Sequence, residues 1–173
     1  MMDKDNAKIR YAVYDTEAGN VTLLADKKCL VGLLFGSRDP EGAINEENAA
    51  LYDGIIELNQ YFFGQRKTFD LKLHLSVSDE ANKVLEYVKS IPYGKTKTYA
   101  EVAADLGGSF TSEIVETVLL NNPIPLIIPC HRVVKSPTEY GKYRGGDVLK
   151  SMLLKMEAKN TNRTFKPGEY VDI

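Results

Sequence analysis

Cysteine and histidine are scarce in this chain of 173 residues, with only two of each. Two cysteines, Cys29 and Cys130, are too few for a disulfide framework, which favours a reducing compartment. A zinc site needs about four ligands, and the cysteines and histidines lack the paired spacing of such sites. The composition therefore predicts neither a disulfide-stabilised fold nor a metal site, and we expect no cofactor.

Long apolar runs are also missing. The stretch NPIPLIIPC is one of the longest, and it is far shorter than the roughly 20 residues of a membrane-spanning helix. The first ten residues, MMDKDNAKIR, are charged and contain no apolar signal core. We therefore expect a cytoplasmic protein that does not associate with membranes.

A strong excess of positive charge is absent as well. The net charge is −2 and the pI about 5.8, whereas nucleic-acid-binding domains are more often clearly basic. Residues 1–78 have 9 Lys and Arg against 12 Asp and Glu, and residues 79–173 have 13 against 12. The second part is thus mildly basic, and it contains the adjacent pair Cys130-His131.

The pattern up to about residue 75 predicts a small sheet with one helix. β-branched and aromatic runs separated by turn residues indicate strands at Tyr11–Tyr14, Val21–Ala25 and Leu30–Phe35. Apolar residues at helical spacing follow, namely Leu51, Ile55, Leu58 and Phe62. The alternating stretch TFDLKLHL, residues 68–75, predicts a further short strand. We expect these elements to form an N-terminal domain over residues 1–76.

The pattern after residue 77 is mostly helical. Helices are predicted over residues 80–91, 99–106, 111–122 and 147–159. Thr98 and Glu101 have the spacing of a capping box at the start of the second of these helices. We expect a second domain over residues 77–173 that ends in a polar tail from Asn160 onward.

The pair Cys130-His131 has two interpretations. A single Cys at the end of an apolar run is commonly a small buried hydrophobe. However, the prolines at 123, 125 and 129 indicate a stiff loop rather than a helix or a central strand. A thiol must ionise before it can attack, and a neighbouring imidazole can accept its proton. Because neighbours on an extended segment point to opposite sides, the two side chains can communicate only through a bend or a bridging water.

Three blocks of the second part resemble the methylated-DNA–protein-cysteine methyltransferases, which repair guanine alkylated on oxygen 6. IPYGKTKTYAEVAADLG is similar to one segment of that family, and NNPIPLIIPCHRVV contains its Pro-Cys-His-Arg-Val signature. GKYRGG followed by LKSMLLKMEA is similar to its last loop and helix. The blocks follow one another at the spacing of the family, whereas residues 1–75 resemble it only in outline.

The resemblance implies a role for each matching residue. Cys130 would be the nucleophile and permanent alkyl acceptor, His131 the general base acting through a water, and Glu157 the group that orients His131. Tyr99 would protonate the departing guanine and help to rotate the nucleotide. The DNA-binding or substrate-binding residues implied are Asn122, Arg132, Tyr143, Arg144 and the position of Glu113. The implied partner is double-stranded DNA containing alkylated guanine, and we expect a monomer.

The sequence departs from the family in the helix expected to recognise DNA. The family has arginine and glycine where this chain has Glu113 and Glu116. Both fall on the helix face opposite Val115 and Leu119, so their carboxylates would repel phosphates. Glu113 also lies in the first helical turn, where a carboxylate interacts favourably with the helix dipole. We therefore expect weak DNA binding.

The predicted fold is a mixed α/β (α+β) protein. The resemblance implies a small ribonuclease-H-like sheet domain followed by a winged-helix-like catalytic domain. The predicted function is DNA repair by irreversible, single-turnover alkyl transfer to Cys130. Two alternatives remain: a divergent homologue that binds DNA or another partner without repair, and a small-molecule thiol enzyme that uses Cys130 and His131.

Overall fold

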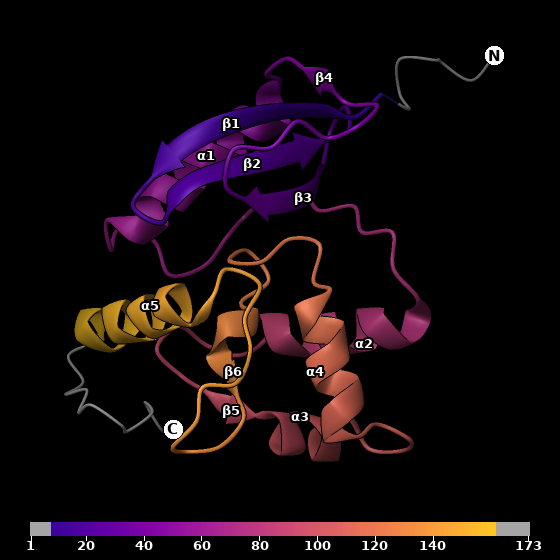
Figure 1. Ribbon diagram of the computed structural model, residues 1–173, viewed down its shortest axis with the longest axis vertical. Coiled ribbons are helices and arrows are strands. Elements are labelled where there is room, and N and C mark those ends of the chain that lie inside the picture. The colour runs from indigo at the N-terminus through magenta and orange to yellow at the C-terminus, as the bar shows by residue number, and fades with distance from the viewer. Residues whose placement is uncertain (1–7, 162–173) are drawn as a thin grey trace. The chain divides into compact units, whose positions relative to one another are not determined.

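The computed structural model describes residues 8–161 of the chain, which separate into two compact units dividing between Ser76 and Val77 (Figure 1). The first unit is a sheet with one helix, and the second is mostly helical. The predicted mixed α/β class is therefore confirmed. The predicted polar tail, apart from Asn160 and Thr161, falls outside the described residues.

The sheet of the first unit has four strands in the order β3-β2-β1-β4. Strands β1 (Arg10–Thr16), β2 (Gly19–Ala25) and β3 (Leu30–Phe35) are antiparallel neighbours, and the two-residue β4 (Ile44–Asn45) runs parallel to β1. The β1–β2 turn ends at Gly19, whose φ of +83° suits glycine best. The strands predicted at Tyr11–Tyr14, Val21–Ala25 and Leu30–Phe35 are confirmed. β1 is three residues longer than predicted, β2 is two residues longer, and β3 has the predicted bounds.

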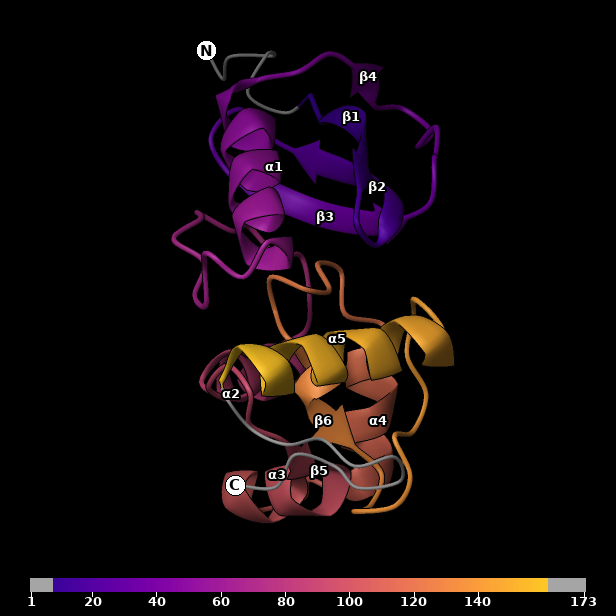
Figure 2. The same ribbon diagram turned by 90° about the vertical axis from the view of Figure 1, so that its left-hand side faces the viewer.

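Helix α1 (Ala49–Phe62) packs on one face of this sheet (Figure 2). Asn48 caps its first turn by accepting a hydrogen bond from the Leu51 N–H at 3.0 Å. The buried face contains the residues whose spacing predicted the helix: Leu51, Ile55, Leu58 and Phe62. Burial of each such side chain contributes about 1.5–3 kcal/mol. The core of the first unit therefore lies between α1 and the sheet.

The prediction of a strand over residues 68–75 is wrong. Only Leu73 forms a bridge, with Leu30, through hydrogen bonds of 2.9 Å on either side of it. The segment before it is held by a side chain instead, because the Asp70 N–H donates to the Glu57 carboxylate at 2.9 Å. Alternating polarity thus produced an extended segment, but one that pairs with the sheet at a single residue.

Residues 77–161 of the second unit form four α-helices and a short parallel ribbon. The helices are α2 (Asp79–Lys89), α3 (Tyr99–Leu106), α4 (Ser112–Leu120) and α5 (Asp147–Asn160). Side chains of Ser78, Thr98 and Thr111 cap the first three, and Thr98 forms the predicted capping box with Glu101. No helix within residues 8–161 is long and apolar enough to cross a membrane.

The parallel ribbon connects helix α3 with the segment that contains Cys130. Strand β5 (Lys97–Thr98) pairs with β6 (Val133–Val134). β5 leads directly into α3, and β6 directly follows the 3-10 turn η1 (Cys130–Arg132). The pairing therefore brings the start of α3 next to the predicted nucleophile, although the two segments are about 30 residues apart in sequence.

Candidate active site

A short, tightly held loop carries Cys130. Asn122 is fully buried at the start of this loop, where its side chain donates to the Ile128 carbonyl and accepts from the Ile124 N–H, both at 3.0 Å. Leu126 has a φ of +73°, in a region that residues other than glycine rarely adopt. Its fully buried side chain holds this backbone conformation in place. The side-chain amide of Asn122 thus fixes the backbone of the loop that leads to Cys130.

The Cys130 thiol is almost entirely buried, at 3% exposed. Burial raises the pKa of Cys130, and this outweighs the opposing effects of an Asn122 hydrogen bond and of the positive charges of Lys150 and Arg144. Cys130 is therefore a protonated thiol at neutral pH, and its attack requires a base to take the proton.

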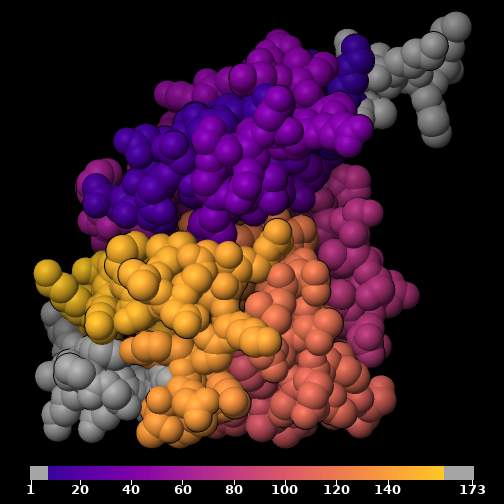
Figure 3. Space-filling view, viewed as in Figure 1, coloured from indigo at the N-terminus to yellow at the C-terminus, as the bar shows by residue number. Residues whose placement is uncertain are grey.

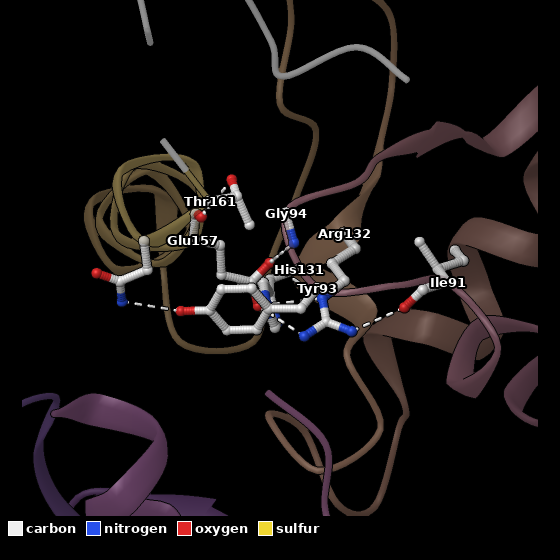
Figure 4. Close-up of polar contacts among 8 residues, drawn as sticks. Ile91, Tyr93, Gly94, His131, Arg132, Glu157 and Thr161 are labelled. Atoms are coloured by element: carbon white, nitrogen blue, oxygen red, sulfur yellow. Dashed lines mark hydrogen bonds and ion pairs between the residues drawn. The ribbon is translucent and has the colours of Figure 1, made fainter. Parts of the chain in front are cut away.

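His131 is oriented by a buried carboxylate. The 3-10 turn provides the bend that the sequence analysis required between Cys130 and His131. His131 is fully buried, and its Nε2 lies 3.0 Å from Oε1 of Glu157 on α5 (Figure 4). Burial lowers the pKa of His131 despite the opposing effect of Glu157, so the imidazole is neutral at neutral pH. With Nε2 facing Glu157, Nδ1 is the ring atom that can accept a proton.

Glu157 is itself held by Arg132 and Gly94. The Arg132 guanidinium donates to both carboxylate oxygens at 2.7–3.0 Å and to the Ile91 carbonyl at 2.7 Å, and the Gly94 N–H donates to Glu157 Oε2 at 3.2 Å (Figure 4). Burial alone would raise the pKa of Glu157, but interactions with His131 and Arg132 lower it to about 2. Glu157 is therefore ionised in the folded protein at neutral pH.

The placement of Arg132 differs from the sequence interpretation, which grouped it with the DNA-binding or substrate-binding residues. Arg132 is 5% exposed, and its guanidinium faces inward toward Glu157, 5.5 Å from the centroid of the Tyr93 ring. A buried guanidinium that is already bonded to a carboxylate and a carbonyl has little capacity left for phosphate. In the structure, the Arg132 side chain is thus bonded to Glu157 inside the unit rather than exposed at its surface.

Tyr99 occupies the first position of α3, next to the loop that contains Gly141. Its hydroxyl lies 3.5 Å from the Lys142 carbonyl, and a Cβ on Gly141 would come 2.6 Å from the same hydroxyl. Position 141 therefore requires glycine both for space and for its φ of +77°. Burial raises the pKa of Tyr99, with further contributions from Glu116 and Cys130, so Tyr99 remains a phenol.

Sequence reasoning missed Lys150, a fully buried cation of α5. Its Nζ donates to the Val133 carbonyl at 2.7 Å and the Lys142 carbonyl at 3.4 Å, and lies 5.8 Å from the centroid of the Tyr99 ring. Burial lowers the pKa of Lys150 to about 8, against opposing effects of Cys130, Asp147 and Glu116. The sequence did contain an indication of its burial, because Lys150 has helical spacing with Leu153, Leu154 and Glu157, which form the buried face of α5. We refer to Tyr99, Cys130 and Lys150 as the acceptor cluster.

Tyr143 and Arg144 lie on the loop between β6 and α5. Tyr143 is 8% exposed, and its ring lies edge-on to His131 with the centroids 6.4 Å apart. Arg144 is exposed and donates a hydrogen bond to the Asn122 carbonyl. The structure thus brings Asn122, Tyr143 and Arg144 to the immediate surroundings of Cys130 and His131.

Helix α4 follows α3 and lies at the surface of the second unit (Figure 3). Val115 and Leu119 form its buried face, as predicted, and Glu113 is exposed in its first turn. Glu116 differs from the prediction, because it is half-buried rather than fully on the outer face. The two carboxylates of α4 therefore occupy different environments.

Two family profiles match the chain. Residues 9–75 match the profile described as "6-O-methylguanine DNA methyltransferase, ribonuclease-like domain". Residues 79–159 match "6-O-methylguanine DNA methyltransferase, DNA binding domain". Together these matches extend over both units of the structure.

Individual relatives are similar over most of the chain. A methylated-DNA–protein-cysteine methyltransferase of Methanosarcina acetivorans is 32% identical over 152 residues, which cover 85% of this chain and 97% of the relative. The crystal structure of Mycobacterium tuberculosis O6-methylguanine methyltransferase superposes with a TM-score of 0.80 at 30% identity, covering 88% of this chain and 94% of that one. A Mycobacterium tuberculosis OGT in complex with DNA gives a TM-score of 0.81 at 30% identity, covering 87% and 94%.

Proposed function

Because this chain belongs to the 6-O-methylguanine DNA methyltransferase family, we propose that it repairs DNA by transferring the alkyl group from oxygen 6 of guanine to Cys130. The observation that carries the assignment to Cys130 is the buried series Cys130, His131 and Glu157. In this series a protonated thiol precedes a neutral imidazole that an ionised carboxylate orients.

The transfer is an in-line displacement. The Cys130 proton passes to His131 Nδ1 through a water as the sulfur attacks the alkyl carbon. The bond from sulfur to carbon forms, the bond from carbon to oxygen 6 breaks, and its electron pair remains on the purine. Glu157 stabilises the imidazolium that results, because its carboxylate lies 3.0 Å from Nε2. The thioether does not revert, so each molecule reacts once.

The departing purine must gain a proton to become neutral guanine. Tyr99 is the donor that this site offers, because it keeps its phenolic proton and belongs to the acceptor cluster. The buried positive charge of Lys150 also favours the negative charge that develops on sulfur and then on the purine. The acceptor cluster therefore stabilises both reacting partners while their charges change.

The proposed substrate is alkylated guanine in double-stranded DNA, and the chain acts on it as a monomer in the reducing cytoplasm. Since Cys130 is only 3% exposed, the guanine must leave the base stack to reach it, which costs a few kcal/mol. Helix α4 is the proposed contact with the duplex. Its exposed Glu113 repels phosphate, and few counterions are released on binding, so affinity is expected to be weak.

Intact-mass spectrometry tests the proposal. The protein is incubated with a duplex containing O6-methylguanine and, in parallel, with free O6-benzylguanine. We expect one equivalent of adduct, located on Cys130 by peptide mapping, in wild type and in Cys29→Ala. Cys130→Ala should form no adduct.

Two results would contradict the proposal. An adduct on Cys29 would show that the nucleophile is misassigned. Repeated turnover by protein of unchanged mass would instead identify a small-molecule thiol enzyme.

A further inference from the structure

The ion pair that orients His131 is held in part by the loop after α2, residues 91–94. The Ile91 carbonyl accepts a hydrogen bond from the Arg132 guanidinium at 2.7 Å, and the Gly94 N–H donates to Oε2 of Glu157 at 3.2 Å (Figure 4). Backbone groups at the two ends of this loop therefore hold one member of the ion pair each.

Tyr93 contacts the same ion pair with its side chain. Its ring centroid lies 5.5 Å from Cζ of Arg132, and a guanidinium within about 6 Å of a ring centroid is attracted by the face of the ring. Tyr93 is only 9% exposed, so little water weakens this attraction. Arg132 thus contacts Glu157, the Ile91 carbonyl and the Tyr93 ring.

The Tyr93 hydroxyl connects the loop to helix α5. It accepts a hydrogen bond from the side-chain amide of Asn160 at 3.0 Å (Figure 4). Asn160 is the last residue of α5, and it lies three positions after Glu157, on the same side of the helix. Thr161 follows and packs closely on the loop, because a Cβ on Gly94 would come 2.8 Å from its side chain. The end of α5 that carries Glu157 is therefore fastened to the loop at two neighbouring residues.

His131 and Arg132 share one oxygen of Glu157. Oε1 lies 3.0 Å from Nε2 of His131 and accepts a hydrogen bond from Nη2 of Arg132 at 2.7 Å. If the guanidinium moved, it would carry this oxygen with it and change the distance between the carboxylate and the imidazole. The position of Arg132 therefore sets the direction of the contact between Glu157 and His131.

We propose that Tyr93 is a positioning residue for alkyl transfer. Its ring holds the Arg132 guanidinium, and its hydroxyl holds the end of α5 that carries Glu157. Together these contacts keep Oε1 of Glu157 facing Nε2 of His131. The inference rests on the proposed function, in which the opposite ring nitrogen of His131 takes the thiol proton. Tyr93 takes no part in the bonds that form and break.

The expected effect of removing the Tyr93 hydroxyl is that of one hydrogen bond. The net contribution of such a bond corresponds to roughly 2-fold to 12-fold in the population of the arrangement that contains it. Loss of the hydroxyl should therefore slow transfer by a factor within this range. The ring contributes separately, because Tyr93→Phe keeps a ring beside the guanidinium.

Single-turnover rates of adduct formation on Cys130 of the full-length protein, with O6-benzylguanine, give the first test. Tyr93→Phe and Asn160→Ala each remove one partner of the same bond, so each should slow transfer by roughly 2-fold to 12-fold. The double variant should be no slower than the single variants, because two changes that remove one interaction are not additive. Tyr87→Phe is the matched control. Its hydroxyl donates to Asp105 in the same unit, and its loss should leave the rate unchanged.

Proton exchange measured by NMR separates positioning from general stability. The proton on Nε2 of His131 is buried against Glu157, and its exchange with solvent requires this contact to open. Tyr93→Phe and Asn160→Ala should each accelerate this exchange by the same roughly 2-fold to 12-fold. The backbone amide of Val102, which is buried in α3, should exchange at the wild-type rate.

Several outcomes would overturn the inference and leave the proposed function intact. These are wild-type transfer rates in Tyr93→Phe and Asn160→Ala, or equal slowing by Tyr87→Phe. Exchange of the His131 proton that is unchanged, or that accelerates together with the Val102 amide, would have the same meaning. Absence of any adduct on wild-type protein, with benzylguanine or with the methylated duplex, would instead refute the proposed function. The exchange measurement needs no substrate, so it would still show whether Tyr93 fixes the contact of His131 with its carboxylate.

Discussion

The two cysteines and two histidines of this chain form two sites that look alike in composition and differ in setting. In the first unit, His74 Nδ1 lies 3.0 Å from Asp26 Oδ2, and Asp26 also accepts a hydrogen bond from the Cys29 N–H. In the second unit, His131 Nε2 lies 3.0 Å from Glu157 Oε1, and Cys130 precedes it in the chain. Each site thus contains a cysteine, a histidine and a carboxylate, with the same distance between imidazole and carboxylate.

Burial separates the two sites. The His74 side chain is 69% exposed, whereas that of His131 is fully buried. Asp26 directs its carboxylate partly to the backbone N–H groups of Lys28 and Cys29, as in an ordinary turn. Glu157 is enclosed by Arg132, His131 and Gly94. A catalytic arrangement of these three residue types therefore depends on exclusion of water and on a fixed base, which their spacing alone does not provide.

Replacing each histidine should give the largest difference in reaction rate between the two sites. His131→Ala deletes the base that accepts the thiol proton, so transfer to Cys130 should slow by about 10²–10⁴-fold. His74→Ala removes an exposed imidazole, and the rate should not change. Single-turnover rates with O6-benzylguanine measure both effects. Equal rates for His131→Ala and wild type would mean that Cys130 ionises without this imidazole.

The two carboxylates provide a second, smaller test. Glu157→Gln keeps the size of the side chain but removes the charge that orients and stabilises His131. The imidazole itself stays in place to accept the thiol proton, so the slowing should be smaller than that of His131→Ala. Asp26→Asn should leave the rate unchanged.

A control is needed for stability, because Glu157→Gln also leaves the buried Arg132 without its anion, at a cost that can reach several kcal/mol. Urea unfolding of both variants establishes the folded fraction at the temperature of the assay. A folded Glu157→Gln protein that reacts at the wild-type rate would contradict the role proposed for Glu157.

Reversing one charge on an exposed helix of each unit tests where DNA binds. We expect this change to have the smallest effect of the three. Glu113→Arg on α4 should raise affinity for a methylated duplex several-fold and steepen the salt dependence by about one phosphate contact. The matched change Asp53→Arg, at an exposed position of α1, should do neither. Fluorescence anisotropy at two salt concentrations measures both. Equal gains from the two variants would indicate nonspecific attraction rather than a DNA-contacting α4.

The helices and strands could be predicted from the sequence more accurately than the contacts between distant segments. Local spacing predicted α1 and the capping box at Thr98, because periodicity and caps depend on neighbouring residues. The resemblance pointed to Cys130, His131 and Glu157, which the structure brings together. Their proposed roles remain predictions that the experiments above address.

What the sequence did not reveal depends on tertiary packing. A lysine such as Lys150 is usually exposed, and only its position among the buried residues of α5 shows that it is enclosed. The inward direction of Arg132 follows from Glu157 and Ile91, which are 25 and 41 residues away. Helical spacing likewise predicted Glu116 to be as exposed as Glu113. Spacing along one helix cannot show how much of a side chain a neighbouring helix covers.

The buried position of Glu157 also has a consequence for the stability of the fold in acid. Its carboxyl has an ordinary pKa of 4.5 when the chain is unfolded and a pKa of about 2 when it is folded. Its ionised form therefore stabilises the folded protein fully above pH 4.5, and this contribution is lost as the pH falls toward 2. His131 acts in the same direction, because its lowered pKa means that acid protonates the unfolded chain first, below pH 6.5. We therefore expect the groups proposed for catalysis to be those that make the second unit sensitive to acid.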